Sequence, residues 1–207
     1  VAPSRGLGDV YKRQSLEEIS AAVSEGARLG IPTAAHCIGG QGLKDCIDGG
    51  VDVIEHMYMA SEQDVERLAA SRCVVDLTSG IFLDPSREEF LSPANALKVR
   101  LNRSRVRENV ARIIKARLPF VLGTDAYHGF LYREVGYAVE LGAAPVTAIQ
   151  GVTSRAARVC RLEDRIGKLE NGMEADIIAV EGNPLEDVSR LSQVGLVMKG
   201  GVVYRQP

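Results

Sequence analysis

Three histidines and one aspartate stand where short apolar segments of the sequence end. His36 and His56 each close such a segment, and Asp125 follows a third, with His128 three residues further on. Imidazole nitrogens and a carboxylate oxygen form a ligand set that catalytic zinc and related divalent ions favour. A single histidine at the end of a strand is usually a core or capping group. Two histidines and an aspartate in the same type of position instead indicate a metal site.

Apolar segments and helical patterns alternate through the first half of the chain. Such alternation is typical of parallel strands joined by crossover helices, and the nearly continuous apolar strands fit a sheet covered on both faces. Because the carboxyl ends of parallel strands lie on one face of a barrel, we expect His36, His56 and Asp125 to converge there. The expected strands are 32–36, 51–55, 73–77 and 120–122, the expected helices are 15–30, 43–47, 61–70 and 98–117, and 84–97 is expected to be a loop.

Two arrangements of these strand–helix units fit the pattern. They form half of a (β/α)₈ barrel, or they form a small open doubly wound sheet. Beyond Asp125 the pattern changes to short strands at 176–180, 194–198 and 202–204, the last two separated by two glycines as in a tight hairpin. Strands this close together cannot continue a parallel barrel, so we expect them to form a separate β appendage.

The composition excludes several classes of partner. The 207 residues carry a formal net charge of −2 and the pI is near 6.0, so no global basic field attracts nucleic acid or an anionic membrane. No apolar run approaches the ~20 residues that span a bilayer. The four cysteines are scattered without a CxxC pair, which indicates reduced, buried thiols and a cytoplasmic protein rather than disulfides or a zinc knuckle.

Two further patterns have both a functional and a plain structural interpretation. Gly39–Gly42 stands between a strand and a helix and could cradle a phosphate, but it lacks the spacing of either nucleotide motif, which favours an ordinary turn. The basic helix 98–117 could bind nucleic acid, but no aromatic residues interleave with its Lys and Arg residues. A solvated outer helix is therefore the favoured interpretation.

The segments around the candidate ligands resemble a known family. TAAHCIGG at 33–40, VDVIEHMYMAS at 51–61 and FVLGTDAYHG at 120–129 resemble, in this order, the motifs of strands five, six and eight of the amidohydrolase superfamily. The tail, from TSRAARVCRLEDRIGKLENGMEADIIAVEGNPLEDV to VMKGGVVY, is similar to the family's closing segment. The GTDA and HG residues look most like the imidazolonepropionase-related peptidases and prolidases. The resemblance covers residues 15–206.

This resemblance implies roles for individual residues. His36, His56 and Asp125 would bind one or two divalent metal ions, for which zinc is expected, although manganese, iron and nickel suit similar ligands. Asp125 would also act as general base, moving a proton from water to the leaving nitrogen. His128 would lie at the rim, where it binds a substrate carboxylate or polarises the scissile carbonyl, unless it is simply a solvated loop histidine.

The resemblance also implies a domain organisation. Residues 15–170 would form the C-terminal half, strands five to eight, of a (β/α)₈ TIM-type barrel, and 171–207 would supply strands of a small β-sandwich appendage. Residues 1–14 lack an initiator Met and any periodicity, so we interpret them as a non-native or artefactual segment. The family's HxH pair and its bridging Lys or Glu, which belong to the first half of the barrel, are not found in this sequence.

The function implied is that of a metal-dependent hydrolase cleaving carbon–nitrogen bonds, other than the peptide bonds of long chains. Its substrate would be a small molecule such as a cyclic amide, an amidine or a dipeptide. Since three candidate ligands are fewer than a binuclear site needs, we expect this chain, as an incomplete fragment, to be inactive by itself. The alternative is a non-catalytic amidohydrolase-fold protein that binds a partner. Unpaired sheet edges would favour a homo-oligomer.

Overall fold

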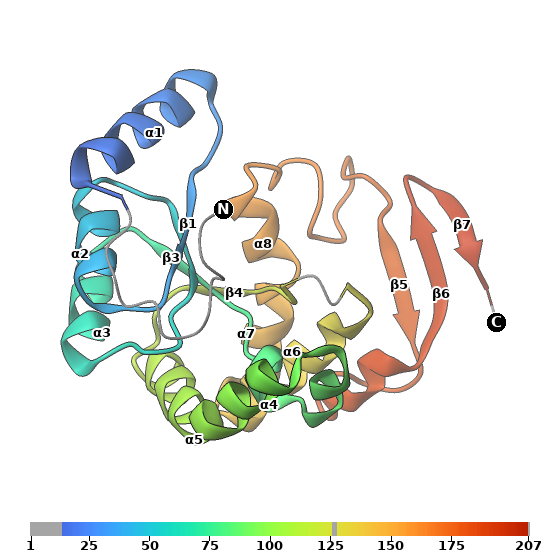
Figure 1. Cartoon of the computed structure of the whole chain (residues 1–207). Coiled ribbons are helices and arrows are strands. Elements are labelled where there is room, and N and C mark those ends of the chain that lie inside the picture. The colour runs from blue at the N-terminus through green and yellow to red at the C-terminus, as the bar shows by residue number, and fades with distance from the viewer. Residues whose placement is uncertain (1–13, 126–127, 207) are drawn as a thin grey trace.

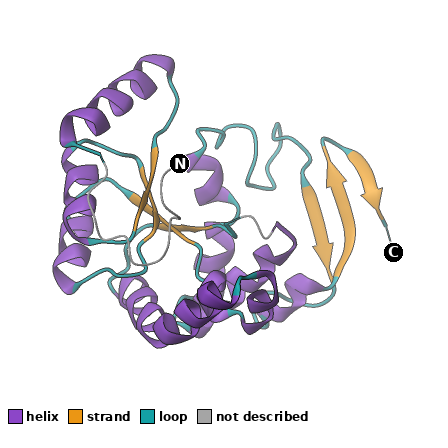
Figure 2. Cartoon of the chain, viewed as in Figure 1, coloured by secondary structure: helices purple, strands orange, loops and turns teal. Residues whose placement is uncertain are grey.

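The computed structural model describes residues 14–125 and 128–206 and contains two separate sheets (Figures 1 and 2). The first is a four-stranded parallel sheet in the order β1-β2-β3-β4, and the second is a three-stranded antiparallel sheet in the order β5-β6-β7. The strands are β1 (Ala34–Cys37), β2 (Val53–His56), β3 (Val74–Leu77), β4 (Phe120–Leu122), β5 (Ile177–Val180), β6 (Val194–Lys199) and β7 (Val202–Arg205).

Helices connect the parallel strands and form an arc around the first sheet (Figure 1). Within the described part of the chain, no helix is both long and apolar enough to cross a membrane. The α-helices are α1 (Leu16–Leu29), α2 (Gly40–Asp48), α3 (Glu62–Ala69), α4 (Gly80–Leu83), α5 (Pro93–Lys115), α6 (Leu131–Glu140), α7 (Pro145–Gly151) and α8 (Ser154–Val159), and the 3₁₀ helices are η1 (Pro85–Phe90), η2 (His128–Phe130) and η3 (Val188–Ser192).

Local capping explains where several helices begin. The expected capping box at the start of α1 is present: the Ser15 hydroxyl accepts from the Glu18 N–H, and the Glu18 carboxylate accepts from the Ser15 N–H. The expectation of a loop at 84–97 was wrong, because α5 begins at Pro93. Proline is favoured in the first turn, where its missing N–H costs nothing, and the Ser92 hydroxyl caps the helix.

The two faces of the parallel sheet differ in what covers them. Ile54, Val75 and Leu77 are fully buried and belong to the apolar core that packs against the helices. His36 pairs with Glu55 in the register of β1 and β2, and Glu55 pairs with Asp76 in that of β2 and β3. Since neighbours in register share a face, these three polar side chains lie on the opposite face of the sheet.

The second sheet is a simple antiparallel meander. The Gly200-Gly201 turn between β6 and β7 has φ of 54° and 80°, values that glycine adopts without strain and that suit a two-residue hairpin. Of the four cysteines, all of which are free, Cys37, Cys46 and Cys73 are buried as expected. Cys160 is exposed, which contradicts its expected burial, because it follows the last turn of the short helix α8 at the surface.

Candidate active site

The structure brings His36 and His56 together at the carboxyl ends of β1 and β2. Their ring centroids lie 4.5 Å apart and the rings meet edge to face, at 67°. Strand alternation alone would place His56 on the other face, because Glu55 shares a face with His36. His56 instead adopts φ of 82°, in the left-handed region that side chains rarely occupy. We attribute the convergence of the two rings to this backbone turn at the end of β2.

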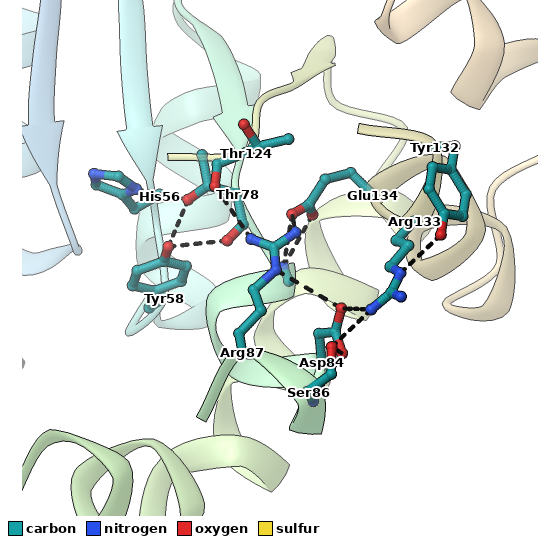
Figure 3. A network of polar contacts seen from close by, with 11 residues as sticks. His56, Tyr58, Thr78, Asp84, Ser86, Arg87, Thr124, Tyr132, Arg133 and Glu134 are labelled. Carbon is teal, nitrogen blue, oxygen red and sulfur yellow. Dashed lines mark hydrogen bonds and ion pairs between the residues drawn. The ribbon is translucent and has the colours of Figure 1, made fainter. Parts of the chain in front are cut away.

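Hydrogen bonding fixes the orientation of the His56 ring. Nδ1 of His56 lies 2.7 Å from Oγ1 of Thr78, the residue after β3 (Figure 3). The Tyr58 hydroxyl donates to the Thr78 carbonyl at 3.1 Å, contacts the Thr78 hydroxyl, and its ring stacks on His56 with centroids 5.2 Å apart. When Nδ1 carries the proton and donates to Thr78, Nε2 is left with the lone pair that a cation needs.

His56 is electrostatically suited to bind a cation. Burial, the larger cause, and the neighbouring His36 lower the pKa of His56 to about 4, while the Asp125 carboxylate acts in the opposite direction. The imidazole is therefore neutral near pH 7. Neutral imidazole is the form that coordinates metals, so no proton has to be displaced from this ring before a cation binds.

Asp125 lies in a tight turn two residues beyond Gly123, at the end of β4. Its φ is 49°, a left-handed conformation that aspartate tolerates better than most residues. A Cβ on Gly123 would lie only 2.6 Å from the Asp76 carboxylate on the neighbouring strand, so a larger residue here would force that side chain to move. Asp125 is exposed, and its charge acts on His56, Tyr58 and Asp76.

Two carboxyl groups, those of Glu55 and Asp76, lie next to His36 in the register of the sheet. Burial, the largest cause, and the facing Glu55 carboxylate raise the pKa of Asp76 to about 8. Its Oδ1 atom is buried without a hydrogen-bond partner among the described residues. Sequence reasoning missed Asp76, Thr78 and Tyr58. The signals available were a carboxylate inside the apolar segment Val74–Leu77 and the polar residue directly after it.

The residues present fit a divalent cation in type and protonation state. The His36 and His56 rings lie edge to face, and the neutral His56 ring uses Nδ1 for its hydrogen bond to Thr78, which leaves Nε2 for a cation. Carboxyl groups lie near the ends of the neighbouring strands. Among residues 14–125 and 128–206, however, no group of three or more His, Cys, Asp or Glu side chains is gathered closely enough to hold an ion. Of the expected ligands, His36 and His56 are in contact and Asp125 is not part of such a group. His128 begins η2, and its side chain lies outside the described part of the chain.

Comparison with known proteins agrees with this architecture. Residues 13–204 match the model of the Amidohydrolase family. The chain is 33% identical to ochratoxinase of Aspergillus niger, over 99% of this chain and 44% of that protein. It is 23% identical to an imidazolonepropionase of Desulfotalea psychrophila over 86% of this chain and 39% of that protein.

A solved structure of a Xaa-Pro dipeptidase with methionine bound in its active site shows the same fold. It superposes with a TM-score of 0.83 at 30% identity, over 92% of this chain and 49% of that one. The chain thus spans about half the length of the relatives it matches. The parallel α/β sheet expected from the sequence is confirmed, and the chain belongs to the amidohydrolase family.

Proposed function

We propose that this chain contributes to a metal-dependent amidohydrolase that hydrolyses carbon–nitrogen bonds of small molecules. The observation that carries the proposal is the contact between His36 and His56, whose ring centroids are 4.5 Å apart at the carboxyl ends of adjacent parallel strands. Family membership supports it, since the matched relatives carry the names of hydrolases.

In this proposal His36, His56 and Asp125 would hold one or two divalent ions, with zinc as the expected metal. A divalent cation, when bound, lowers the pKa of a coordinated water towards ~7 and polarises the scissile carbonyl. Thr78 holds the His56 ring in its orientation. Asp125, exposed beside the histidines, accepts a proton from the attacking water and passes it to the leaving nitrogen. His128 would contact the substrate from the rim.

The proposal includes an assignment of the fold. Residues 15–170 would supply strands five to eight of a (β/α)₈ barrel, and 171–207 would supply strands of a small β domain. The strand order β1-β2-β3-β4, with consecutive parallel pairs, is what this assignment requires. The chain's match to about half of each relative also supports it.

The substrate class we propose is a dipeptide-like compound, a cyclic amide or an amidine. The dipeptide-like option draws on the Xaa-Pro dipeptidase, and the cyclic amide on the imidazolonepropionase. We further propose a cytoplasmic location, based on four unpaired cysteines, and a homo-oligomeric state.

Metal affinity tests the core of the proposal without requiring turnover. Zn²⁺ is titrated into the purified chain against a chromophoric chelator, and His36→Asn and His56→Asn variants are measured in parallel. Both substitutions should weaken binding strongly, whereas His128→Asn should leave it unchanged. Wild-type binding no tighter than that of the His36→Asn/His56→Asn double variant would rule out this metal centre.

A further inference from the structure

Arg87 is completely buried, which is unusual for a cationic side chain and requires compensating contacts. It lies in η1, between β3 and α5 (Figure 3). Its Nη1 donates to the carbonyl of Thr124 at 3.1 Å, and its Nη2 donates to Oε1 of Glu134 at 2.8 Å. Its Nε lies 3.8 Å from Oδ2 of Asp84. One guanidinium thus joins the end of β4 to α6 and to η1.

The partners of Arg87 are themselves held in place. The Gly80 N–H, at the start of α4, donates to both Glu134 carboxylate oxygens, at 2.9 and 3.0 Å. A Cβ at Gly80 would collide with Arg87 and Glu134, so glycine is what lets these side chains approach the backbone. Asp84 accepts from Arg133 at 2.6 Å and from the Ser86 hydroxyl at 2.7 Å. The guanidinium therefore has one well-defined position.

The carbonyl that Arg87 binds belongs to the peptide unit directly before Asp125. That peptide leads into the left-handed turn, with φ of 49° at Asp125. On the amino side, the Gly123 N–H donates to the Leu77 carbonyl at 3.1 Å. Contacts from Leu77 in β3 and from Arg87 in η1 therefore define the backbone from which the Asp125 carboxylate projects. The rigid peptide plane transmits the position of its oxygen to the following Cα.

We propose that Arg87 is a positioning residue, which holds the Thr124–Asp125 peptide so that the Asp125 carboxylate faces the His36–His56 pair. This inference rests on the proposed function, because it assumes that Asp125 binds the ion. A buried arginine could instead serve only to tie α6 to η1. The contact with the Thr124 carbonyl separates these roles, since it adds nothing to the α6–η1 connection made through Glu134.

Arg103 provides a matched control. Like Arg87, it donates to a backbone carbonyl, that of Phe82 at 2.6 Å, and it also forms an ion pair with a glutamate, Glu88. It belongs to α5 and makes no described contact with the end of β4. Arg87→Lys and Arg103→Lys both keep the positive charge. Each loses the planar guanidinium, which can donate to a carbonyl and to a carboxylate at the same time.

The test is the Zn²⁺ affinity of these variants in two backgrounds, with Asp125 present and with Asp125→Asn. Arg87→Lys should raise the Kd by about 10- to 100-fold when Asp125 is present, the usual effect of disturbing a residue that orients a metal ligand. It should change the Kd little in the Asp125→Asn background, and Arg103→Lys should change it little in either. An equal effect of Arg87→Lys in both backgrounds, or no effect in either, would overturn the inference.

Two further measurements distinguish the positioning role from a general loss of stability and from a failure of the proposed function. The double variant Arg87→Met/Glu134→Met removes both buried charges together, so the fold should tolerate it better than the loss of Arg87 alone. The zinc affinity of this double variant should still fall. Amide hydrogen exchange at Gly123–Asp125 should accelerate in Arg87→Lys and not in Arg103→Lys. If wild type binds no zinc, the proposed function fails, while unchanged exchange at this turn refutes the positioning role independently.

Discussion

Nδ1 of His56 lies 2.7 Å from Oγ1 of Thr78, so the third parallel strand orients an imidazole that the second strand carries. β3 carries none of the expected ligands, yet Thr78 directly follows it and selects which nitrogen of His56 faces outward. The proposed site therefore draws on all four strands of the sheet, including β3, which carries none of the expected ligands.

Replacing Thr78 by Val should weaken Zn²⁺ binding by about 10- to 100-fold, because the isosteric side chain fills the space but leaves Nδ1 without its partner. Thr78→Ser retains the hydroxyl and should bind zinc nearly as wild type does. Chelator competition on both variants measures this. Equal affinities for the Val and Ser variants would show that the hydroxyl does not orient the ring.

Gly123→Ala should destabilise the fold by about 1–3 kcal/mol, the usual cost of overpacking. The added Cβ would lie 2.6 Å from Oδ2 of Asp76, so the carboxylate would have to leave its place on β3. Chemical denaturation of the variant measures the change in the free energy of unfolding.

Two further variants identify the cause of that change. Asp76→Ala should recover much of the loss when combined with Gly123→Ala, because it removes the colliding carboxylate. Gly136→Ala, in α6 where nothing lies within 4 Å of the added Cβ, should instead stabilise by up to ~1 kcal/mol through helix propensity. A Gly123→Ala variant as stable as Gly136→Ala would contradict the close approach of Gly123 to the Asp76 carboxylate.

Asp64 should give the fold a stability term that is lost in acid. Its buried Oδ2 accepts from the Ser61 N–H and hydroxyl, both at 2.9 Å, and from the Gly40 N–H at 3.2 Å. Burial acts to raise the pKa of Asp64, but the bonds from Ser61 and Gly40 and the nearby Arg67 outweigh it and lower the pKa. A depressed folded-state pKa stabilises the fold above the unfolded value of ~3.9, and that stability disappears as the pH falls below it.

Asp64→Asn should accordingly cost about 1–3 kcal/mol at pH 7, with the difference from wild type shrinking below pH 4. Urea unfolding across pH 3–7 measures it. Asp48→Asn, which removes an exposed i,i+4 partner of Lys44, should change stability by no more than ~0.5 kcal/mol at any pH. A pH-independent effect of Asp64→Asn would mean that the charge of the carboxylate does not stabilise the N-terminal ends of α2 and α3.

Much of the parallel sheet was predictable because its signals are local. Apolar segments alternate with capped helices, and the Ser15–Glu18 box is readable from two residues three positions apart. The placement of His36 and His56 at the same end of the sheet was also predictable, since parallel strands share a carboxyl end, but the contact between their rings was not. The place of Asp125 as a ligand stays a prediction.

What the sequence could not show depends on contacts between distant segments or on backbone turns. The left-handed conformation of His56 has no sequence signature, because histidine adopts it only when tertiary contacts impose it. The Arg87–Glu134 pair joins two segments 47 residues apart, and each residue alone resembles an ordinary surface charge. The start of α5 did have a signal, Ser92 followed by Pro93, which the mixed polar composition of 84–97 concealed.

The dispersal of the candidate site over β1, β2, β3 and β4 has a consequence for the folding equilibrium itself. No single strand–helix unit contains enough of the candidate ligands to hold a cation. An ion would therefore bind the folded sheet much more tightly than the unfolded chain. By mass action, free zinc at a hundred times its Kd would then shift the equilibrium by about 2.7 kcal/mol towards the folded state. The melting temperature of this chain would therefore rise with the concentration of free zinc around it.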